Sequence, residues 1–530
     1  MDLQENLLRR VALGDTIHRS ALRYRRKMAI IDRGFGKRLT YEEFDSQTNQ
    51  IAHALFDLGL EKGDTVAVVA PNCAELILSY YGIAKAGMVF VTLNPNQSTK
   101  DIQFMITNAD SKAVIVDEQF IPKVQEMLHE IKVQHVVGIS RTKPVPDGII
   151  DFNAFLAKGS PRMVKVIIND RDPAQILYTG GTTSLPRAAE HHHLGFVLNG
   201  ANTALDFKMD HHVIWLTALP IYHLAGFNQL MVALFLVGAT EVILPGFDPS
   251  EILKTIEEEK VTGIFALSPL FRMLIDHPDF DKYDHSSLKM GIYFGAVMPD
   301  SLLKECMEKL CPEFALEYGQ TEAGDGTTFK PEDQLRKIGS MGNSGTFVEL
   351  RIMDDDGNLL PSGEPGNIVY RSPFICQKIY GDEKATEEAF KFGWFHSGDI
   401  GKMDEDGYFY FLDRKKDMIK TGGENVTSAE VEKAIYRDER VQEVNVIGLP
   451  HDFWMEAVTA FVTPKSGTEI TEEEIINLCK EYLSGYKVPK KVIFTSDLPR
   501  SLTGKVLKTK MRQQYIDLYS NESDSATRSS

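Results

Sequence analysis

The chain has 530 residues, more than the roughly 250–300 at which one hydrophobic core stops growing, so two or more domains are expected. Its 58 basic and 75 acidic residues give a net charge of −17, which argues against general binding to nucleic acid or anionic membranes but not against a local anion site. Five scattered cysteines without a CxxC pair indicate neither a zinc site nor a disulfide framework, and they favour a reduced, cytoplasmic compartment.

The first half of the chain alternates strand-like and helix-like segments. Strand patterns occupy residues 65–70, 89–93, 112–116, 135–139, 242–244 and 262–267. Helical patterns occupy residues 74–85 and 249–260. This alternation predicts an α/β architecture with largely parallel sheets. The longest apolar stretch, 230–245, is interrupted by Gly238 and Glu241, so we expect a buried helix followed by a strand and not a membrane span.

From about residue 340 the pattern changes to short strands with many turns. Asp-Gly steps within 354–357 and 404–407 predict turns in a small β-rich subdomain. A polar run at 413–417 then interrupts the apolar pattern, and a compact α+β unit follows. We therefore predict an N-terminal domain at 1–413, a C-terminal domain at 414–518 and a disordered tail at 519–530.

A loop rich in glycine and threonine follows Ile176 and Leu177, which predict the end of a strand. Its glycines let backbone N–H groups approach a ligand, its hydroxyls add donors, and a terminal arginine adds positive charge. Such donors suit a polyphosphate, although the Gly-Lys-Ser/Thr ending of the P-loop is absent. The residues assigned to this phosphate-binding role are Thr179, Gly180, Gly181, Thr182, Thr183 and Arg187.

Four further segments carry groups suited to nucleotide chemistry, although each alone also fits a turn, a cap or a solvated charge. Residues 318–322 offer a ring for stacking on a base, a hydroxyl for a phosphate and a carboxylate for Mg²⁺. Asp399 can accept hydrogen bonds from ribose hydroxyls, and Arg414 lies fifteen residues later. A glycine turn at 422–423 precedes a predicted helix, and Lys505 lies on a glycine-hinged loop near the C-terminus.

Together and in this order, the five segments resemble the adenylate-forming superfamily of acyl-CoA ligases, peptide-synthetase adenylation domains and firefly-type luciferases. The resemblance covers almost the whole chain, from 39–41 to Lys505. It implies a large N-terminal domain of two α/β subdomains plus a β-barrel-like subdomain, and a small, mobile α+β C-terminal domain with a hinge near Lys416. It also implies an enzyme that uses ATP and Mg²⁺ to convert a carboxylic acid into an acyl-adenylate and then passes the acyl group to CoA, releasing AMP and pyrophosphate.

The resemblance assigns roles to individual residues of the nucleotide site. Tyr318 matches the adenine-stacking residue, Thr321 the hydroxyl near the α-phosphate, and Glu322 the Mg²⁺ ligand. Asp399 and Arg414 match the pair that binds the ribose.

The reacting groups and the CoA path are assigned in the same way. Lys505 matches the lysine that bridges the substrate carboxylate and the α-phosphate, so Lys505, Thr321 and His223 form the expected catalytic set. Gly423 falls where the pantetheine arm of CoA passes. The remaining nucleotide- or CoA-binding positions are Gly295, Ala296, Gly319 and Gly422.

Residues 219–226 resemble the Pro-x-Tyr/Phe-His-x-x-Gly segment of acyl- and aryl-CoA ligases, in which His223 gates or lines the acyl pocket. This segment contains no Asp to pair with a substrate amine, which disfavours an amino acid substrate. Gly324 and Gly326 are expected to leave room beside Leu224 and Phe227. This expectation favours a bulky apolar acid, either aromatic or a medium- to long-chain fatty acid.

Two alternatives stay open. One is a ligase that loads a free-standing carrier protein. The other is a nucleotide-binding homologue that has lost catalysis, because the chain departs from the family pattern at Ser184, Arg187, Ala188 and Met455. Adjacent histidines at 191–193 point in different directions, so no metal is assigned to them. The expected partners are a carboxylic acid, ATP and CoA, without nucleic acid, for a monomer or homodimer.

Overall fold

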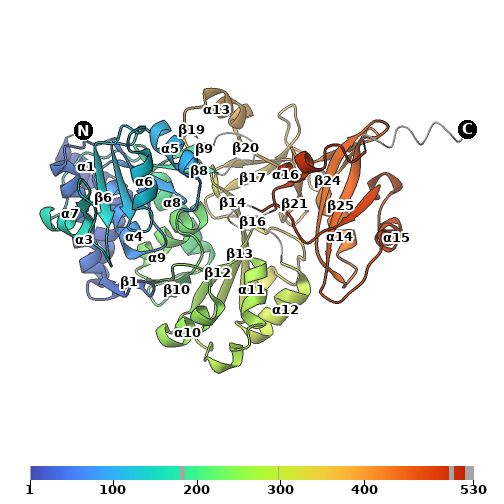
Figure 1. Ribbon diagram of the computed structural model, residues 1–530, viewed down its shortest axis with the longest axis horizontal. Coiled ribbons are helices and arrows are strands. Elements are labelled where there is room, and N and C mark those ends of the chain that lie inside the picture. The colour runs from blue at the N-terminus through green and yellow to red at the C-terminus, as the bar shows by residue number, and fades with distance from the viewer. Residues whose placement is uncertain (1, 180–185, 296–297, 501–505, 520–530) are drawn as a thin grey trace, which may run out of the picture.

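The computed structural model describes residues 2–179, 186–295, 298–500 and 506–519, which form four β-sheets with their helices. Figure 1 shows two α/β units, a β-rich unit beside them and a C-terminal unit at the far end of the long axis. Within the described ranges, no helix combines the length and the apolar character needed to cross a membrane.

An eight-stranded sheet in the order β19-β9-β8-β4-β3-β5-β6-β7 forms the first unit. Val66 and Val68 of β3 pack with α3 and α4, whereas Ala67 and Val69 pack with α5 and α6 on the opposite face. Both faces are buried, which explains the continuous apolar runs of its central parallel strands. The strands are β3 (Thr65–Val69), β4 (Val89–Leu93), β5 (Ala113–Asp117), β6 (His135–Ile139), β7 (Ile150–Asp151), β8 (Pro173–Thr179), β9 (Arg187–His192) and β19 (Lys378–Ile379).

Helices of this unit lie along the first 206 residues, with one later helix beside β19. The helix predicted at 74–85 is confirmed as α4, which buries most of its residues. The helices are α1 (Leu3–Arg9), α2 (Leu13–Tyr24), α3 (Tyr41–Asp57), α4 (Ala74–Lys85), α5 (Thr99–Asn108), α6 (Ile121–Met127), α7 (Phe152–Lys158), α8 (His193–Asp206) and α13 (Glu383–Ala389).

The second unit is a nine-stranded sheet in the order β16-β15-β14-β13-β12-β10-β11-β1-β2. Strands β1, β11, β10, β12, β13 and β14 are parallel, and antiparallel strands flank them on both sides. The strands are β1 (Met28–Asp32), β2 (Lys37–Thr40), β10 (Ile214–Thr217), β11 (Thr240–Ile243), β12 (Gly263–Ala266), β13 (Met290–Phe294), β14 (Glu313–Gln320), β15 (Gly324–Phe329) and β16 (Asn343–Ser344).

Helices cover both faces of this second sheet. Leu216 and Val242 face α10, α11 and α12, whereas Trp215 and Phe265 face α8 and α9. The apolar stretch 230–245 forms a helix and then strand β11, as predicted, but the helix is preceded by a π-helical segment, η1 (Ala225–Met231). The α-helices are α9 (Val232–Val237), α10 (Pro249–Glu259), α11 (Ser268–Ile275) and α12 (Asp300–Lys309).

The third unit is an antiparallel sheet in the order β17-β18-β20-β21. The resemblance implied a β-barrel-like unit here, and the described residues form a β-rich unit without a closed barrel. In the described residues the outer strands β17 and β21 do not pair with each other, so the sheet stays open. Its strands are β17 (Glu349–Met353), β18 (Gly366–Arg371), β20 (Phe395–Met403) and β21 (Phe409–Arg414).

The C-terminal unit is α+β, as expected, and its sheet uses only residues that follow 418. Its long hairpin of β24 and β25 packs against α14 and α16. The predicted boundary at 413 falls inside β21, which ends at Arg414. The elements are β22 (Ile419–Thr421), β23 (Glu424–Val426), α14 (Ser428–Ile435), β24 (Val441–His451), β25 (Met455–Pro464), α15 (Glu472–Tyr482), β26 (Lys491–Phe494) and α16 (Lys508–Gln514).

Candidate active site

Asp399 lies at the centre of the candidate site. It sits on β20 directly opposite Arg414 on β21, and it is 4 % exposed. Its Oδ2 atom accepts hydrogen bonds from the Tyr318 hydroxyl at 2.7 Å and from Nε2 of Gln320 at 3.0 Å. The Arg414 Nε atom lies 3.8 Å from Oδ1. The described residues donate two hydrogen bonds to Oδ2 and none to Oδ1. Oδ1 therefore remains available to hydroxyls of a ligand, next to the half-exposed guanidinium of Arg414.

Tyr318 and Gln320 reach Asp399 because both lie at the carboxyl end of β14. The chain shifts register between Tyr318 and Gly319, where β14 meets the antiparallel strand β15. A Cβ atom on Gly319 would lie 2.4 Å from the carbonyl oxygen of Gly324, so this close approach requires glycine. Burial raises the pKa of the Tyr318 hydroxyl well above its usual value, which keeps it a neutral donor to Asp399.

Thr321 and Glu322 lie in the turn between β14 and β15. Nε2 of the buried His191, on β9, donates to the Thr321 carbonyl oxygen at 2.8 Å. Burial lowers the pKa of His191 to about 4, so its ring is neutral and carries the proton on Nε2. The Cys376 amide donates to the Glu322 carbonyl oxygen at 2.7 Å. The turn is therefore held by its backbone, which leaves the side chains of Thr321 and Glu322 free to meet a ligand.

The Glu322 carboxylate lies among charges from three other segments. Burial raises its pKa, whereas the positive charges of Arg414 and Arg187 lower it. The structure thus brings Glu322, Arg187, Arg414 and Asp399 within electrostatic reach of one another. The Glu322 carboxyl group accepts a hydrogen bond from its own backbone amide. In the described residues no cluster of His, Cys, Asp or Glu could hold a metal alone. A lone carboxylate of this kind fits Mg²⁺, which takes one or two protein carboxylates and fills its shell with phosphate oxygens.

The predicted phosphate loop connects two antiparallel strands. Strand β8 ends at Thr179 and β9 begins at Arg187, and the Thr179 hydroxyl donates to the Arg187 carbonyl oxygen at 3.2 Å. Arg187 is exposed at the start of β9. The other predicted residues of this loop, Gly180, Gly181, Thr182 and Thr183, lie outside the described residues, as do Ser184, Ala296 and Lys505.

His223 follows β10 and directly precedes the segment that leads into the π-helix η1. Its Nε2 atom is buried without a hydrogen-bond partner among the described residues, and burial lowers the pKa of the ring to about 4. A π-helical turn of this kind often marks a functional site, because it displaces the side chains on one face of a helix. The neutral His223 ring therefore has a free polar atom next to an irregular, apolar helix.

The expectation that Gly324 and Gly326 leave room for an acyl group is wrong. A Cβ atom on Gly324 would lie 2.7 Å from the Phe374 ring, and one on Gly326 would lie 2.6 Å from the Tyr370 ring. The two aromatic rings already occupy the space that the missing side chains leave. These glycines permit close packing and give no information about the size of a substrate.

The remaining glycines lie at two different places. Gly295 follows β13 with a φ of +79° and is exposed beside the carboxyl end of β14. Gly422 and Gly423, with φ values of +57° and +87°, form the turn between β22 and β23 of the C-terminal unit. The Gly422 amide donates to the Trp454 carbonyl oxygen at 2.8 Å. The described contacts do not bring this turn to Asp399.

Two contributors to the site were missed by the sequence analysis. Gln320 lies within the recognised segment, yet its hydrogen bond to Asp399 joins residues 79 positions apart. His191 was considered only as a metal ligand. Its distance from Thr321 along the chain left no local pattern from which the hydrogen bond between them could be found.

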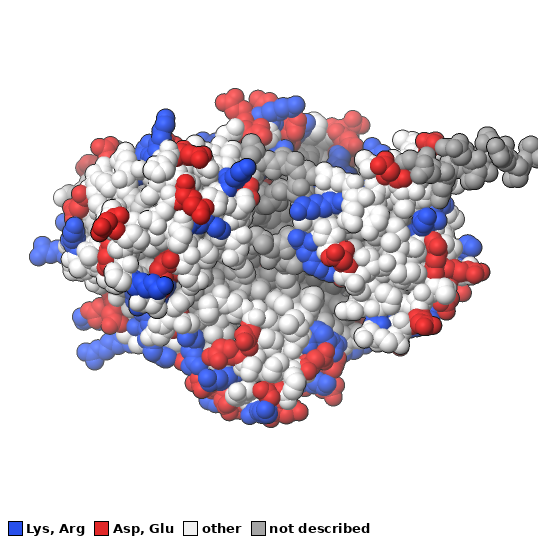
Figure 2. All heavy atoms as spheres, viewed as in Figure 1, with Lys and Arg blue, Asp and Glu red and all other residues white. Residues whose placement is uncertain are grey.

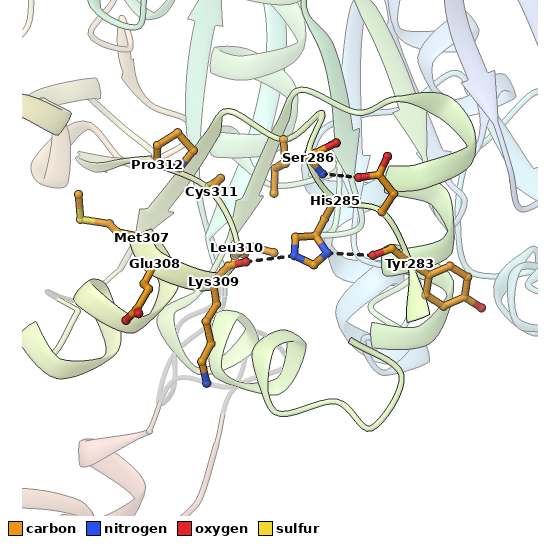
Figure 3. Close-up of a pocket in the computed structure, with 11 residues that line it drawn as sticks. Tyr283, His285, Ser286, Met307, Glu308, Lys309, Leu310, Cys311 and Pro312 are labelled. Carbon is orange, nitrogen blue, oxygen red and sulfur yellow. Dashed lines mark hydrogen bonds between the residues drawn. The ribbon is translucent and has the colours of Figure 1, made fainter. Parts of the chain in front are cut away.

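A surface pocket of about 470 Å³ lies elsewhere, between the loop at 283–288 and the end of α12 (Figure 3). The His285 ring approaches the carbonyl oxygens of Tyr283 and Lys309 at 3.1 and 3.0 Å. The pocket lies at the amino ends of β13 and β14, whereas Asp399, Tyr318 and Gly295 gather at their carboxyl ends. Ligands of open α/β sheets bind at the carboxyl ends, so we assign the site to the Asp399 region.

Basic side chains border the hollow between the N-terminal units and the C-terminal unit, as Figure 2 shows. Elsewhere on this face the two signs of charge are interspersed. Fold and site together describe an α/β protein with a small α+β C-terminal unit and a cluster of polar groups at the carboxyl end of its second sheet.

Comparisons with known proteins assign the family. The model of the "AMP-binding enzyme" family matches residues 17–380, and the model of the "AMP-binding enzyme C-terminal domain" matches residues 430–505. The chain belongs to this family of enzymes.

Similar proteins include acyl-CoA ligases. The long-chain-fatty-acid–CoA ligase FadD13 of Mycobacterium tuberculosis is 33 % identical over 498 residues, covering 92 % of this chain and 96 % of that protein. The feruloyl-CoA synthase of Amycolatopsis sp is 31 % identical, covering 91 % and 94 %. The ATP-bound MatB structure from Rhodopseudomonas palustris has a TM-score of 0.88 at 28 % identity and covers 96 % and 100 % of the two chains.

Proposed function

We propose that the protein is an AMP-forming acid–CoA ligase that activates a fatty or aromatic carboxylic acid. The observation that carries this proposal is the Asp399 cluster. Tyr318 and Gln320 donate to Oδ2, and Oδ1 lies near Arg414 without a hydrogen bond from any described residue. This arrangement suits a nucleoside, whose ribose hydroxyls donate to Asp399 while its base stacks on the Tyr318 ring. The similarity to acyl-CoA ligases supports the same reaction class.

In the first half-reaction a carboxylate oxygen attacks the α-phosphorus of ATP, and the bond to pyrophosphate breaks. Two anions must approach each other, so positive groups that are already in place lower the barrier. Arg187 and Arg414 supply such charge within electrostatic reach of Glu322. Glu322 would hold Mg²⁺ together with phosphate oxygens, and the ion would supply further charge neutralisation. Lys505 is proposed to bridge the carboxylate and the α-phosphate.

In the second half-reaction the CoA sulfur attacks the acyl carbonyl carbon, and the bond to AMP breaks. AMP leaves readily, so this step needs positioning of the thiol more than acid–base catalysis. We propose that the C-terminal domain, residues 414–518, turns about Lys416 between the two steps and presents Gly422 and Gly423 to the pantetheine arm. The exposure of Lys416 between β21 and β22 supports this position for the hinge.

His223 is proposed to line the acyl pocket. Burial lowers the pKa of its ring to about 4, so the ring is neutral, and it precedes η1 in the chain. Its Nε2 has no hydrogen-bond partner among the described residues, so a polar atom is available to an acid without adding charge. The relatives named for fatty acids and for ferulate support an apolar or aromatic acid as the substrate class. The five cysteines, all buried and free, support a reducing, cytoplasmic compartment. Monomer or homodimer stays the prediction for the assembly.

Pyrophosphate exchange into ATP over a panel of fatty, aromatic and amino acids tests the first half-reaction. We expect exchange with fatty or aromatic acids and none with amino acids. No exchange with any acid would overturn the ligase assignment and favour a homologue without catalysis. Comparing CoA with a free-standing carrier protein as acceptor then tests the second half-reaction, and equal activity with both would contradict a dedicated CoA ligase.

The Lys505→Ala variant tests the division between the two steps. We expect adenylation to fall about 10²–10³-fold, as when one preorganised charge is removed from an active site. Thioester formation from presynthesised acyl-AMP and CoA should stay near the level of the unmodified protein. If both steps fall equally, Lys505 does not serve adenylation alone.

A further inference from the structure

Three carboxyl groups meet in the interior behind the segment 318–322. Glu317 lies on β14 directly before Tyr318, Asp325 lies on β15, and Asp206 ends α8. Their exposed fractions are 6 %, 0 % and 7 %. The groups that act on the Glu317–Asp325 pair are other acids and neutral polar side chains, and no basic side chain is among them. Burying three carboxylates without a cation costs several kcal/mol unless hydrogen bonds or protons compensate.

Asp206 is compensated by donors from several segments. Its Oδ2 accepts from Nδ2 of Asn202 and from the Thr328 hydroxyl, both at 3.1 Å, and its Oδ1 accepts from the Thr346 hydroxyl at 2.7 Å. The Thr346 amide also donates to Oδ2, at 3.3 Å. Asp206 therefore has hydrogen-bond donors of its own, and its electrostatic effect raises the pKa of Glu317 and of Asp325.

Glu317 and Asp325 lack such compensation. Asp325 Oδ2 accepts from the Thr203 hydroxyl at 2.6 Å, but its Oδ1 is buried without a partner among the described residues. Oε1 of Glu317 is equally without a partner. The two side chains lie within hydrogen-bonding reach of each other. Two acceptor-only groups in contact repel, whereas a single proton between them turns the contact into a hydrogen bond.

We propose that Glu317 retains a proton that it donates to Asp325, and that this shared proton positions the segment 318–322 for nucleotide binding. Burial and the negative charge of Asp325 raise the pKa of Glu317 well above its usual value. Burial raises the pKa of Asp325, and hydrogen bonds donated by Thr203 and Glu317 offset part of this rise. The other ionisable groups that face the pair are Asp206 and Tyr370, and neither adds positive charge.

The hydrogen bonds around Glu317 and Asp325 join strand β14 to strand β15 and helix α8. Asp399 receives its two hydrogen bonds from β14, so the position of this strand matters for the site. The Asp325 amide donates to Oδ1 of Asn199 on α8 at 3.3 Å, so β15 is tied to α8 by backbone and side chain. Glu317 ties the adjacent strand β14 to the same point, one residue before Tyr318. Loss of the proton would place two carboxylates in contact at the register shift between β14 and β15. Glu317 and Asp325 are positioning residues, because neither contacts the nucleotide-binding atoms.

The test compares Glu317→Gln, Glu317→Ala and the control Glu313→Gln, which removes an exposed acid from the same strand. Glutamine keeps a neutral donor toward Asp325, whereas alanine removes it. Infrared difference spectra should show a protonated-carboxyl band that Glu317→Gln abolishes and Glu313→Gln retains. If the band persists in Glu317→Gln, Glu317 holds no proton and the proposal fails.

The affinity for AMP, measured calorimetrically across pH, tests the positioning role and rests on the proposed function. The affinity of the unmodified protein for AMP should weaken about tenfold at alkaline pH. The affinity of Glu317→Gln should not change with pH, and that of Glu317→Ala should be about tenfold weaker at every pH. Equal weakening in the glutamine and alanine variants would overturn the positioning role, and Glu317→Gln alone decides it if the alanine variant does not fold. Absence of AMP binding by the unmodified protein would overturn the proposed function and the positioning role together, while the infrared comparison still decides the proton.

Discussion

The nucleotide site and the junction of the two domains differ in how their parts are held. Asp399 is 4 % exposed and receives two short hydrogen bonds from β14, with Arg414 opposite it. At the junction, the Ser428 amide donates to Asp413 at 2.6 Å, and Lys415 pairs with Asp355 at side-chain exposures of 54 % and 76 %. We expect the first arrangement to be preorganised for a ligand and the second to give way more easily, because it relies on one buried hydrogen bond and one exposed ion pair.

Lowering the pH is expected to produce the largest difference in stability between the N-terminal and the C-terminal domain. Burial lowers the pKa of four N-terminal histidines to about 4, and the C-terminal domain contributes none of them: His191, His192, His193 and His223. Below pH 6.5 the unfolded chain binds protons that the folded domain rejects, so stability is lost as the pH falls toward 4. Each histidine contributes about 1.4 kcal/mol per pH unit in this window.

Hydrogen exchange read out by peptide is the measurement for this acid effect. Peptides of the N-terminal domain should lose protection at a higher pH than those of residues 419–500. His193→Asn should reduce the pH slope by one proton, whereas His129→Gln, which changes an exposed ring, should not. Simultaneous loss of protection in both domains would contradict the expected difference.

Removing the Asp399 carboxylate should disable the preorganised region. Asp399→Ala removes the acceptor of the Tyr318 hydroxyl and the group proposed to bind ribose, whereas the Gln320 amide keeps the Ser397 carbonyl oxygen at 2.9 Å. We expect kcat/KM for ATP to fall about 10²-fold, since hydrogen bonds to a charged group are worth about 1.5–3 kcal/mol. Steady-state kinetics checks this, with the exposed Asp406→Ala of the same hairpin as the control. An unchanged kcat/KM would remove Asp399 from the site.

Removing the Asp413 carboxylate should loosen the junction without changing the nucleotide site. The N-cap residue Thr427 makes no side-chain hydrogen bond, so Asp413 acts as the cap of α14 from outside the domain. Asp413→Ala should cost about 1–2 kcal/mol of local stability, the usual cost of a lost cap. Faster proteolysis at 414–418 with an unchanged KM for ATP is the expected result. A rise in that KM comparable to the effect of Asp399→Ala would show that the two regions are not independent.

The ion pair of Lys415 with Asp355 should contribute least. Both side chains are more than half exposed, so water and salt screen their attraction. Lys415→Ala should change the free energy of unfolding by less than about 0.5 kcal/mol in urea denaturation. A loss above about 1 kcal/mol would mean that the pair does more at the junction than its exposure suggests.

Local patterns predicted the elements well wherever one periodicity dominated. The helix at 74–85 and the strands at 89–93 and 135–139 have the predicted bounds, because buried strands and an apolar helix leave continuous signals. The η1 segment had no such signal, since π-helical turns follow from packing and not from a repeating pattern. The barrel was expected from resemblance alone, and the strands paired as an open sheet.

The sequence singled out residues that the structure brings together, but it could not give the contacts between them. The order of segments identified Tyr318, Glu322 and Asp399, yet the hydrogen bonds that Asp399 accepts join positions about 80 residues apart. The room expected beside Gly324 and Gly326 is filled by rings from β18 and the following loop, which no local pattern could show. Pairings across such distances depend on strand register, and the register emerges only when the sheets assemble.

The pairing of β20 with β21 also constrains the length of the chain. Consecutive strand residues point to opposite faces, so Arg414 turns toward Asp399 while Asp413 turns toward α14. A single-residue insertion in β21 ahead of Asp413 would exchange these two faces and present an acid to the nucleotide and a base to the helix end. Insertion of two residues would restore the faces but place Arg414 two positions beyond its partner Asp399. The spacing of fifteen positions between Asp399 and Arg414 is therefore as much a part of the site as the two side chains are.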